Sequence, residues 1–281
     1  MRMDEQEESQ NVEDMRGAGG FRPIHGIGLG TLLVILIGGW LLGINPIRML
    51  GLLNGTGDEA QTQSTPAGAP SADDPQAKFV SQILRSTEVV WGHVFQHSGR
   101  QYEDPTLVLY RDSIGTACGM GRSAAGPFYC PSDRKVYLDL VFFDLMTQQL
   151  GAPGQFAHAY VIAHEVGHHV QNLLGTFAAG DADRGANGQS VRLELQADCY
   201  AGVWAKLSQQ EHGWRLESGD IETALNAASQ IGDDTLERRS TGRVVPDSFT
   251  HGTAEQRKRW FMTGYQQGTL KACDTFGAAS L

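Results

Sequence analysis

The pentapeptide His164-Glu165-Val166-Gly167-His168 constrains the fold of this chain more than any other feature. In an α-helix its two histidines lie one turn apart on the same face. Two imidazoles placed in this way can bind one zinc ion, and Glu165 lies beside them, where it can take a proton from a zinc-bound water. Apolar residues recur at helical spacing between Gly154 and Gly175, which predicts a helix around the motif. A buried helix with two incidental histidines is the alternative.

A catalytic zinc ion usually has three protein ligands, so a third is expected elsewhere in the chain. The segment 190–206 has a second strong helical pattern, and within it Glu194 and Asp198 share one face. We expect Glu194 to be the third ligand. We expect Asp198 to accept a hydrogen bond from the outer N–H of a ligating histidine and so to fix its tautomer. The alternative is that both acids are solvated on the helix surface. His169 points about 100° away from His168, so we expect it to be a neighbour and not a ligand.

The motif His164–His169, followed by Glu194–Gly202, resembles the bacterial neutral zinc metallopeptidase family. The segments Cys130–Leu140 and Phe249–Phe261 also resemble blocks of this family, and the similarity extends from about Lys78 to near the C-terminus. The resemblance implies a zincin-like fold. It implies little about the substrate.

Residues 26–44 contain no charged side chain and are long enough, as a helix, to cross a bilayer. Trp40 lies near one end, where it suits a membrane interface. The preceding residues 1–25 are rich in acids, unlike the short basic leader of a cleaved signal peptide. We therefore expect a short N-terminal tail, 1–25, followed by one permanent transmembrane helix; a buried core helix is the alternative. Two arginines before the run and one after it favour an N-terminus inside the cell.

The four cysteines include no close pair of the kind that binds zinc. Cys118 and Cys130 bracket a glycine-rich turn and could form a disulfide, which would leave Cys199 and Cys273 to link the second motif helix to the C-terminal segment. Such bonds need an oxidising compartment. We therefore expect a single-pass protein of the cell inner membrane with its soluble domain in the periplasm. Four buried thiols in a reducing cytosol are the alternative.

The soluble part divides into a flexible linker at 45–77, rich in small and turn-forming residues, and a globular domain at 78–281. The order of its elements is a helix, a small mixed sheet and then mostly helices, which predicts an α+β fold. We expect helices at 79–95, 142–150, 155–174, 190–206, 221–231 and 254–267, and strands at 106–110, 128–129 and 136–140.

Two local patterns in this domain lead to further predictions. If Val136–Leu140 is the last strand of the sheet, it lies beside the active-site cleft and can pair with an extended peptide; a wholly internal strand is the alternative. Thr253 and Gln256 have the spacing of a capping box at the start of the last helix.

The net charge of −10 and the lack of a basic stripe argue against a nucleic-acid partner. The one tight basic cluster, Arg257-Lys258-Arg259, is expected to be a solvated helix face.

These features predict a membrane-anchored peptidase with Zn²⁺ as its cofactor and a peptide or protein as its substrate. Glu165 would act as general base and return the proton to the leaving amine. His251, in a loop just before a helix, is the first candidate to stabilise the developing oxyanion, and Tyr200 is the second; local packing of His251 is the alternative. A competing prediction is a non-catalytic, membrane-tethered scaffold or binding module with a structural or vestigial zinc site. A zinc hydrolase of non-peptide amides is a third.

Overall fold

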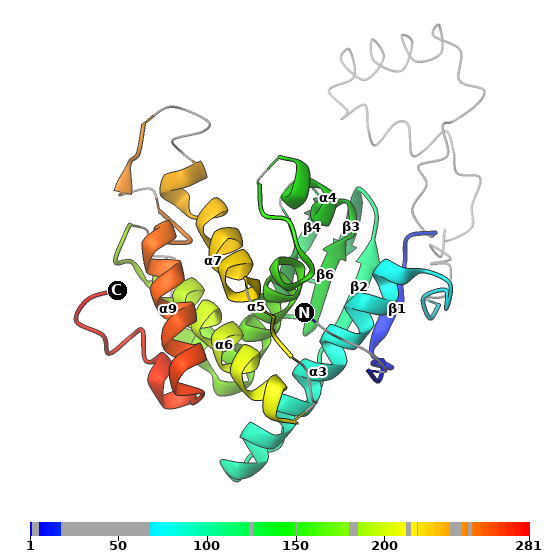
Figure 1. The fold of residues 1–281 in the computed structure, drawn as a ribbon, viewed down its shortest axis with the longest axis horizontal. Helices are drawn as coiled ribbons and strands as arrows, with labels where there is room; N and C mark the ends of the chain where they lie inside the picture. Colours follow the sequence, from blue (N-terminus) through cyan, green and yellow to red (C-terminus); the bar gives the residue numbers. More distant parts are fainter. Residues whose placement is uncertain are drawn as a thin grey trace, which may run out of the picture. The chain divides into compact units, whose positions relative to one another are not determined.

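The computed structural model describes residues 1, 6–17, 68–123, 126–149, 151–179, 185–211, 215–217, 219–236, 243–246 and 249–281. They form an α+β fold, as the sequence predicts, with helices packed beside a small sheet (Figure 1). The helices are α3 (Pro75–His97), α4 (Val141–Gln148), α5 (Gln155–Leu174), α6 (Gln189–Glu211), α7 (Asp220–Gln230) and α9 (Ala254–Gln267), with short 3-10 helices at Thr176–Ala179 and Leu270–Cys273.

The segment 26–44, for which the sequence predicts a membrane span, lies outside the described residues, as does most of the predicted linker 45–77. Across the ranges given above, no helix combines the length and the apolar character needed to cross a membrane. The first helix starts before the predicted domain boundary at 78. Pro75 opens α3, and the Asp74 carboxylate caps it by accepting the N–H groups of Gln76 at 3.0 Å and Ala77 at 3.1 Å.

The main sheet has four strands in the order β1-β2-β6-β5. Strand β2 (Thr106–Tyr110) pairs in parallel with β6 (Lys135–Asp139), and β5 (Phe128–Cys130) pairs antiparallel with β6. Leu107 and Leu109 of β2 pack with the helices, whereas Val108 and Tyr110 alternate onto the other face, beside Ile114. Ile114 belongs to a separate hairpin of β3 (Ser113–Thr116) and β4 (Gly119–Arg122).

Of the two positions that the sequence left open for Val136–Leu140, the structure shows the internal one, so this segment is not the last strand of the sheet. Strand β6 is internal, between β2 and β5, and β5 is the edge strand on that side. The chain reverses between the two strands in a turn where Arg134 has a positive φ of 58° and the Asp133 carboxylate accepts the Lys135 N–H at 3.1 Å. This turn adds the short strand 128–130 outside β6, so the alternative of an internal strand holds.

Strand β1 (Val12–Asp14) is an element that the sequence did not predict, because residues 1–25 were expected to form a tail. It pairs in parallel with β2 at the other edge of the sheet, where Figure 1 shows it in blue. The buried Glu88 carboxylate of α3 accepts hydrogen bonds from the Ser9 hydroxyl and, at 2.9 Å, from the Asn11 side chain. Residues 1–16 and 68–281 accordingly form one compact unit; the other unit, 17–67, lies almost entirely outside the described residues.

Helix α5 contacts α3, α6 and α7 and is buried along most of its length. It meets α6 closely at Gly167, where an added Cβ would lie 3.0 Å from the Ala197 carbonyl oxygen. Helices α6 and α9 approach even more closely, because a Cβ on Gly264 would lie 1.9 Å from the Cys199 carbonyl oxygen. Glycines at these crossings let the helix backbones touch and fix α6 against both neighbours. The capping box of Thr253 and Gln256 is present at the start of α9, as predicted.

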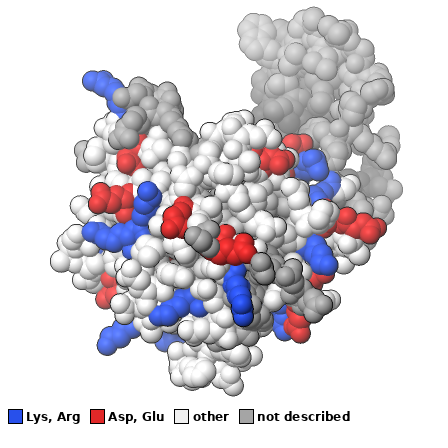
Figure 2. Space-filling model, viewed as in Figure 1, with Lys and Arg blue, Asp and Glu red and all other residues white. Residues whose placement is uncertain are grey.

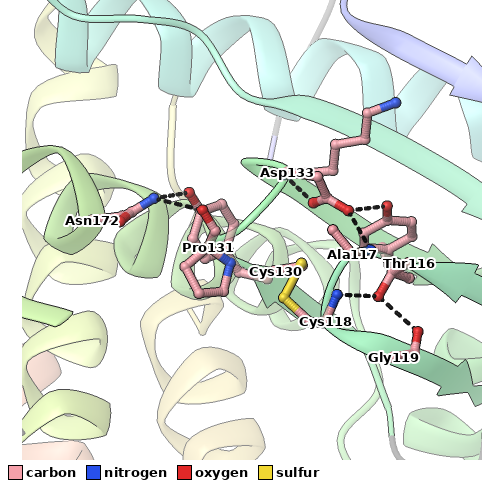
Figure 3. Close-up of a disulfide and its surroundings, with 11 residues drawn as sticks. Thr116, Ala117, Cys118, Gly119, Cys130, Pro131, Asp133 and Asn172 are labelled. Carbon is pink, nitrogen blue, oxygen red and sulfur yellow. Dashed lines mark hydrogen bonds between the residues drawn. A yellow bond between two sulfur atoms is a disulfide. The ribbon is translucent and has the colours of Figure 1, made fainter. Parts of the chain in front are cut away.

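Both predicted disulfides are present, joining Cys118 to Cys130 and Cys199 to Cys273. The first links the β3–β4 hairpin to the edge strand β5 (Figure 3). The Asp133 carboxylate closes the same corner by accepting the Ala117 N–H at 3.1 Å. On the molecular face in Figure 2, acidic and basic side chains are interspersed, without a continuous basic stripe in the part that is described.

Candidate metal centre

The structure brings the three predicted ligands together from two helices. His164 and His168 lie one turn apart on α5, and Glu194 faces them from α6. The Nε2 atom of His164 is 3.2 Å from Glu194 Oε2, and that of His168 is 3.5 Å from Glu194 Oε1. One possible ligand atom of each of the three residues lies within 4.8 Å of the other two. No other cluster of three His, Cys, Asp or Glu side chains that could hold a metal ion occurs in the described ranges.

The outer nitrogens of both histidines are hydrogen bonded to protein acceptors. His164 Nδ1 lies 2.9 Å from Asp198 Oδ1, and His168 Nδ1 lies 2.8 Å from Gln171 Oε1. Each Nδ1–H is a donor in these bonds, so that both Nε2 atoms are directed at one point, and each neutral imidazole would present an unprotonated Nε2 to a metal ion. Asp198 therefore lies where the sequence predicted, whereas Gln171 was missed. Its only signal was its position three residues after His168 on the same helix.

A second buried shell holds Asp198 in place. Arg257 of α9 donates from Nε to Asp198 Oδ2 at 2.8 Å and from Nη2 to Oδ1 at 3.0 Å. The Tyr160 hydroxyl also donates to Asp198. Burial opposes ionisation of the Asp198 carboxyl, but Arg257 and His164 outweigh it and lower its pKa. The expectation of a solvated basic face is therefore wrong for Arg257, which is 2% exposed because it neutralises a buried acid. The expectation is confirmed for Lys258 and Arg259, whose side chains are exposed.

The donor set fits a divalent cation. Two imidazole nitrogens and one carboxylate oxygen are the protein ligands of a catalytic zinc site, and no fourth His, Cys, Asp or Glu joins them in the described part of the chain. Burial disfavours protonated His164, yet the facing carboxylates of Asp198 and Glu194 raise its pKa to about 10. Burial likewise opposes a charged Glu194, and the two imidazoles hold its pKa well below the usual range. The cluster thus attracts positive charge.

A cavity of about 580 Å³ opens onto this cluster. The ligands His164, His168 and Glu194 line it, together with Glu165 and His251. Glu165 is 8% exposed, and burial raises the pKa of its carboxyl group. It follows His164 directly on α5 and faces the same space.

His251 reaches this cavity from the loop before α9, and Asp233 holds it there. Asp233 Oδ2 accepts the backbone N–H groups of Thr250 at 2.7 Å, His251 at 2.6 Å and Gly252 at 3.0 Å. Its Oδ1 lies 3.2 Å from His251 Nδ1. The hydrogen bond that His251 donates to Asp233 raises the pKa of His251 against the opposing effect of burial. Asp233 was not predicted from the sequence, because it belongs to no motif; it begins a short helical segment after α7.

Two other candidates occupy the core. Tyr200 is buried 5.6 Å, ring to ring, from Trp91 of α3 and does not line the cavity, so its prediction as an oxyanion stabiliser is wrong. On α6 it points towards α3, away from the face that carries Glu194. His169 is also buried, as a neighbour of the ligands; its Nε2–H donates to the Glu103 carbonyl at 2.7 Å.

His169 and Asn172 fasten the edge strand β5 to the metal-binding helix. The Tyr129 hydroxyl of β5 donates to His169 Nδ1 at 3.0 Å, and burial lowers the pKa of this imidazole to about 4. Asn172 Nδ2 donates to the Tyr129 hydroxyl at 2.8 Å and to the Pro131 carbonyl at 3.2 Å (Figure 3). Since Phe128 and Tyr129 line the cavity, these bonds place β5 as one of its walls.

Fold and site together define an α+β protein with an H-E-x-x-H metal triad that is completed by a Glu of a later helix. A family model described as "Putative neutral zinc metallopeptidase" matches residues 1–276, and the chain belongs to this family. "Uncharacterized protein YpfJ" of Escherichia coli strain K12 is 49% identical over 99% of both chains. "Uncharacterized protein Mb2605" of Mycobacterium bovis is 48% identical over 64% of this chain and 65% of its own length. No solved structure is significantly similar.

Proposed function

We propose that this protein is a zinc-dependent peptidase in which His164, His168 and Glu194 hold the metal. The observation that carries the proposal is the position of Glu194, which faces both Nε2 atoms from a separate helix while Glu165 lines the same cavity unpaired with any of the three. Zinc, when bound by three protein ligands, lowers the pKa of a coordinated water to about 7 and polarises a carbonyl group.

Glu165 is proposed as the general acid and base. Its carboxylate takes the proton from the attacking water and then gives it to the nitrogen of the leaving amine. Asp198 and Gln171 keep both imidazoles in the tautomer that presents Nε2 to the metal. Arg257 keeps Asp198 charged and fixed, so it acts through Asp198 and not on the substrate.

His251 is proposed to stabilise the oxygen of the scissile carbonyl as it gains negative charge. With Nδ1 held by Asp233, the charged imidazole has its Nε2–H free to donate to that oxygen. The substrate is proposed to lie extended along β5, which is an edge strand and lines the cavity, so that its backbone can add to the sheet.

The proposal is tested with the variant Glu165→Gln, which keeps the shape of the side chain but cannot accept a proton. We expect one zinc per chain in both proteins, chelator-reversible cleavage of a peptide library by the unsubstituted chain, and a loss of cleavage of about 10²-fold or more in the variant. Undiminished cleavage by the variant would disprove the role of Glu165. One zinc per chain without cleavage of any peptide would favour a non-catalytic scaffold.

We propose that the domain works in an oxidising compartment outside the cytoplasm, and the two disulfides support this. Attachment to the inner membrane through residues 26–44 is part of the same proposal. A single crossing there would put β1 and β2 on opposite sides of the bilayer, so it excludes their pairing. Reporter fusions at the two ends of the chain test for a single crossing. Reporters in opposite compartments would show a single crossing, with β1 detached from β2. Reporters in the same compartment would rule out a single crossing and agree with the pairing of β1 and β2.

A further inference from the structure

Much of the lining of the cavity at the metal cluster is apolar. All the charged side chains among its described lining residues belong to the cluster or its immediate support: His164, Glu165, His168, Glu194, His251 and Arg257. The rest of the lining includes Ser123 and Gln149 but is mostly apolar, with Phe128 and Tyr129 from β5 and Phe177 after α5. A further apolar group comes from three elements: Phe142 and Leu145 from α4, Val161 from α5, and Ile231 and Leu236 from the segment after α7.

Val161 places this apolar group relative to the reaction. It precedes Glu165 by four residues, or about one helical turn, on α5, so both side chains lie on the same face, about 6 Å apart along the helix axis. Both line the cavity. A peptide with its scissile bond beside Glu165 therefore has a neighbouring side chain within reach of Val161.

Helix α4 and the segment after α7 are both held by contacts with the elements that carry the metal cluster and His251. Phe142 and Leu145 lie on one face of α4. Between them in the sequence, Phe143 stacks its ring on that of His158 of α5, with centroids 4.2 Å apart. On the other side, the Asp233 N–H donates to the Gly252 carbonyl at 2.9 Å and so ties the segment between Ile231 and Leu236 to the His251 loop. The apolar walls are thus held in place before a substrate arrives.

Leu236 lies at the mouth of the cavity, with 39% of its surface exposed. We infer that Phe142, Leu145, Val161, Ile231 and Leu236 form a specificity site for a bulky apolar side chain, such as leucine or phenylalanine, next to the scissile bond. The inference rests on the proposed peptidase function. An acidic or basic side chain beside these five residues would lose water against apolar surface.

The test uses the full-length, zinc-loaded protein. Cleavage sites in a peptide library are first mapped by mass spectrometry, and matched peptides are then made that differ only at the residue flanking the cleaved bond. We expect kcat/KM for leucine or phenylalanine to exceed that for aspartate or lysine at least tenfold. The same ranking is expected for binding of these peptides to Glu165→Gln, which measures recognition without turnover.

A charge introduced at the mouth should redirect this preference. We expect Leu236→Asp to raise the lysine-to-leucine ratio of kcat/KM about tenfold, because the new carboxylate pairs with the substrate ammonium group. Met120→Asp is the matched control, since Met120 is 66% exposed on β4 and does not line the cavity.

The outcomes separate the two proposals. Cleavage without an apolar preference, or equal effects of Leu236→Asp and Met120→Asp, overturns the specificity site and leaves the peptidase proposal intact. If no peptide is cleaved by the zinc-loaded protein and none binds to Glu165→Gln, the proposed function fails and the specificity site fails with it.

Discussion

Arg257 and Asp198 form a buried ion pair, with Nε 2.8 Å from Oδ2, behind His164, one of the three proposed metal ligands. Neither side chain is more than 2% exposed. The pair connects α9 to α6, and through the Asp198–His164 hydrogen bond it reaches α5. The C-terminal helix therefore controls the orientation of a ligand that lies more than ninety residues earlier in the sequence.

Arg257→Met is expected to destabilise the protein by about 3–5 kcal/mol, because it leaves the Asp198 carboxylate buried without a counter-ion. Zinc affinity should fall by roughly 10–100-fold as His164 loses its fixed orientation. Urea unfolding and competition with a chelator measure the two effects. Lys258→Met is the control, because the neighbouring Lys258 is exposed and should change stability by no more than about 0.5 kcal/mol. Similar effects of both substitutions would contradict this account of the pair.

Asp233→Asn is expected to shift the alkaline limb of the pH–activity profile to lower pH. The hydrogen bond that His251 donates to Asp233 raises the pKa of His251 above its ordinary value. The charge of Glu194 also raises this pKa, and the charge of Arg257 lowers it. His251 therefore stays charged to a higher pH, and activity that needs its Nε2–H is lost as the pH rises through this pKa. The Asn side chain still offers an oxygen to the loop N–H groups but removes the charge.

The control for this shift is the background His251→Gln, in which Asp233→Asn should leave the limb unmoved. A profile that Asp233→Asn does not change in the unsubstituted protein would show that His251 is not the group that titrates.

The two disulfides should contribute unequally to stability. The chain-entropy account predicts about 4.5 kcal/mol for Cys199–Cys273, which are 74 residues apart, and about 3 kcal/mol for Cys118–Cys130, which are 12 apart. Urea unfolding of the two double variants, with alanine at both cysteines of each pair, measures the difference. A larger loss from the shorter loop would mean that strain or residual structure dominates over loop closure.

Gly264→Ala is expected to destabilise the protein by about 3 kcal/mol, at the upper end of overpacking costs, because its Cβ would lie 1.9 Å from the Cys199 carbonyl oxygen. Gly92→Ala is the matched control. Gly92 lies within α3 with nothing within 4 Å of an added Cβ, so alanine there should stabilise by about 0.5–1 kcal/mol. Unfolding midpoints in urea compare the two, and a loss at both positions would reject close packing as the cause.

The sequence by itself determined what lies within single helices and turns. The apolar periodicity around residues 155–174 and the spacing of its histidines predicted the metal-binding helix, because an α-helix fixes the relative direction of side chains three or four residues apart. The capping box of Thr253 and Gln256 was equally local. Glu194 and Asp198 were identified on the same basis, as two acids on one helix face that needed a partner.

The tertiary structure decided which faces meet. The edge position of β5, the pairing of β1 with β2, the burial of Arg257 and the position of Asp233 beside His251 all join segments that are distant in the sequence. No local periodicity encodes such contacts, since they depend on how closely whole elements approach, as α6 and α9 do at Gly264. The sequence thus determined the candidate metal-binding residues, and packing between helices decided which residues support them and which elements line the cavity beside them.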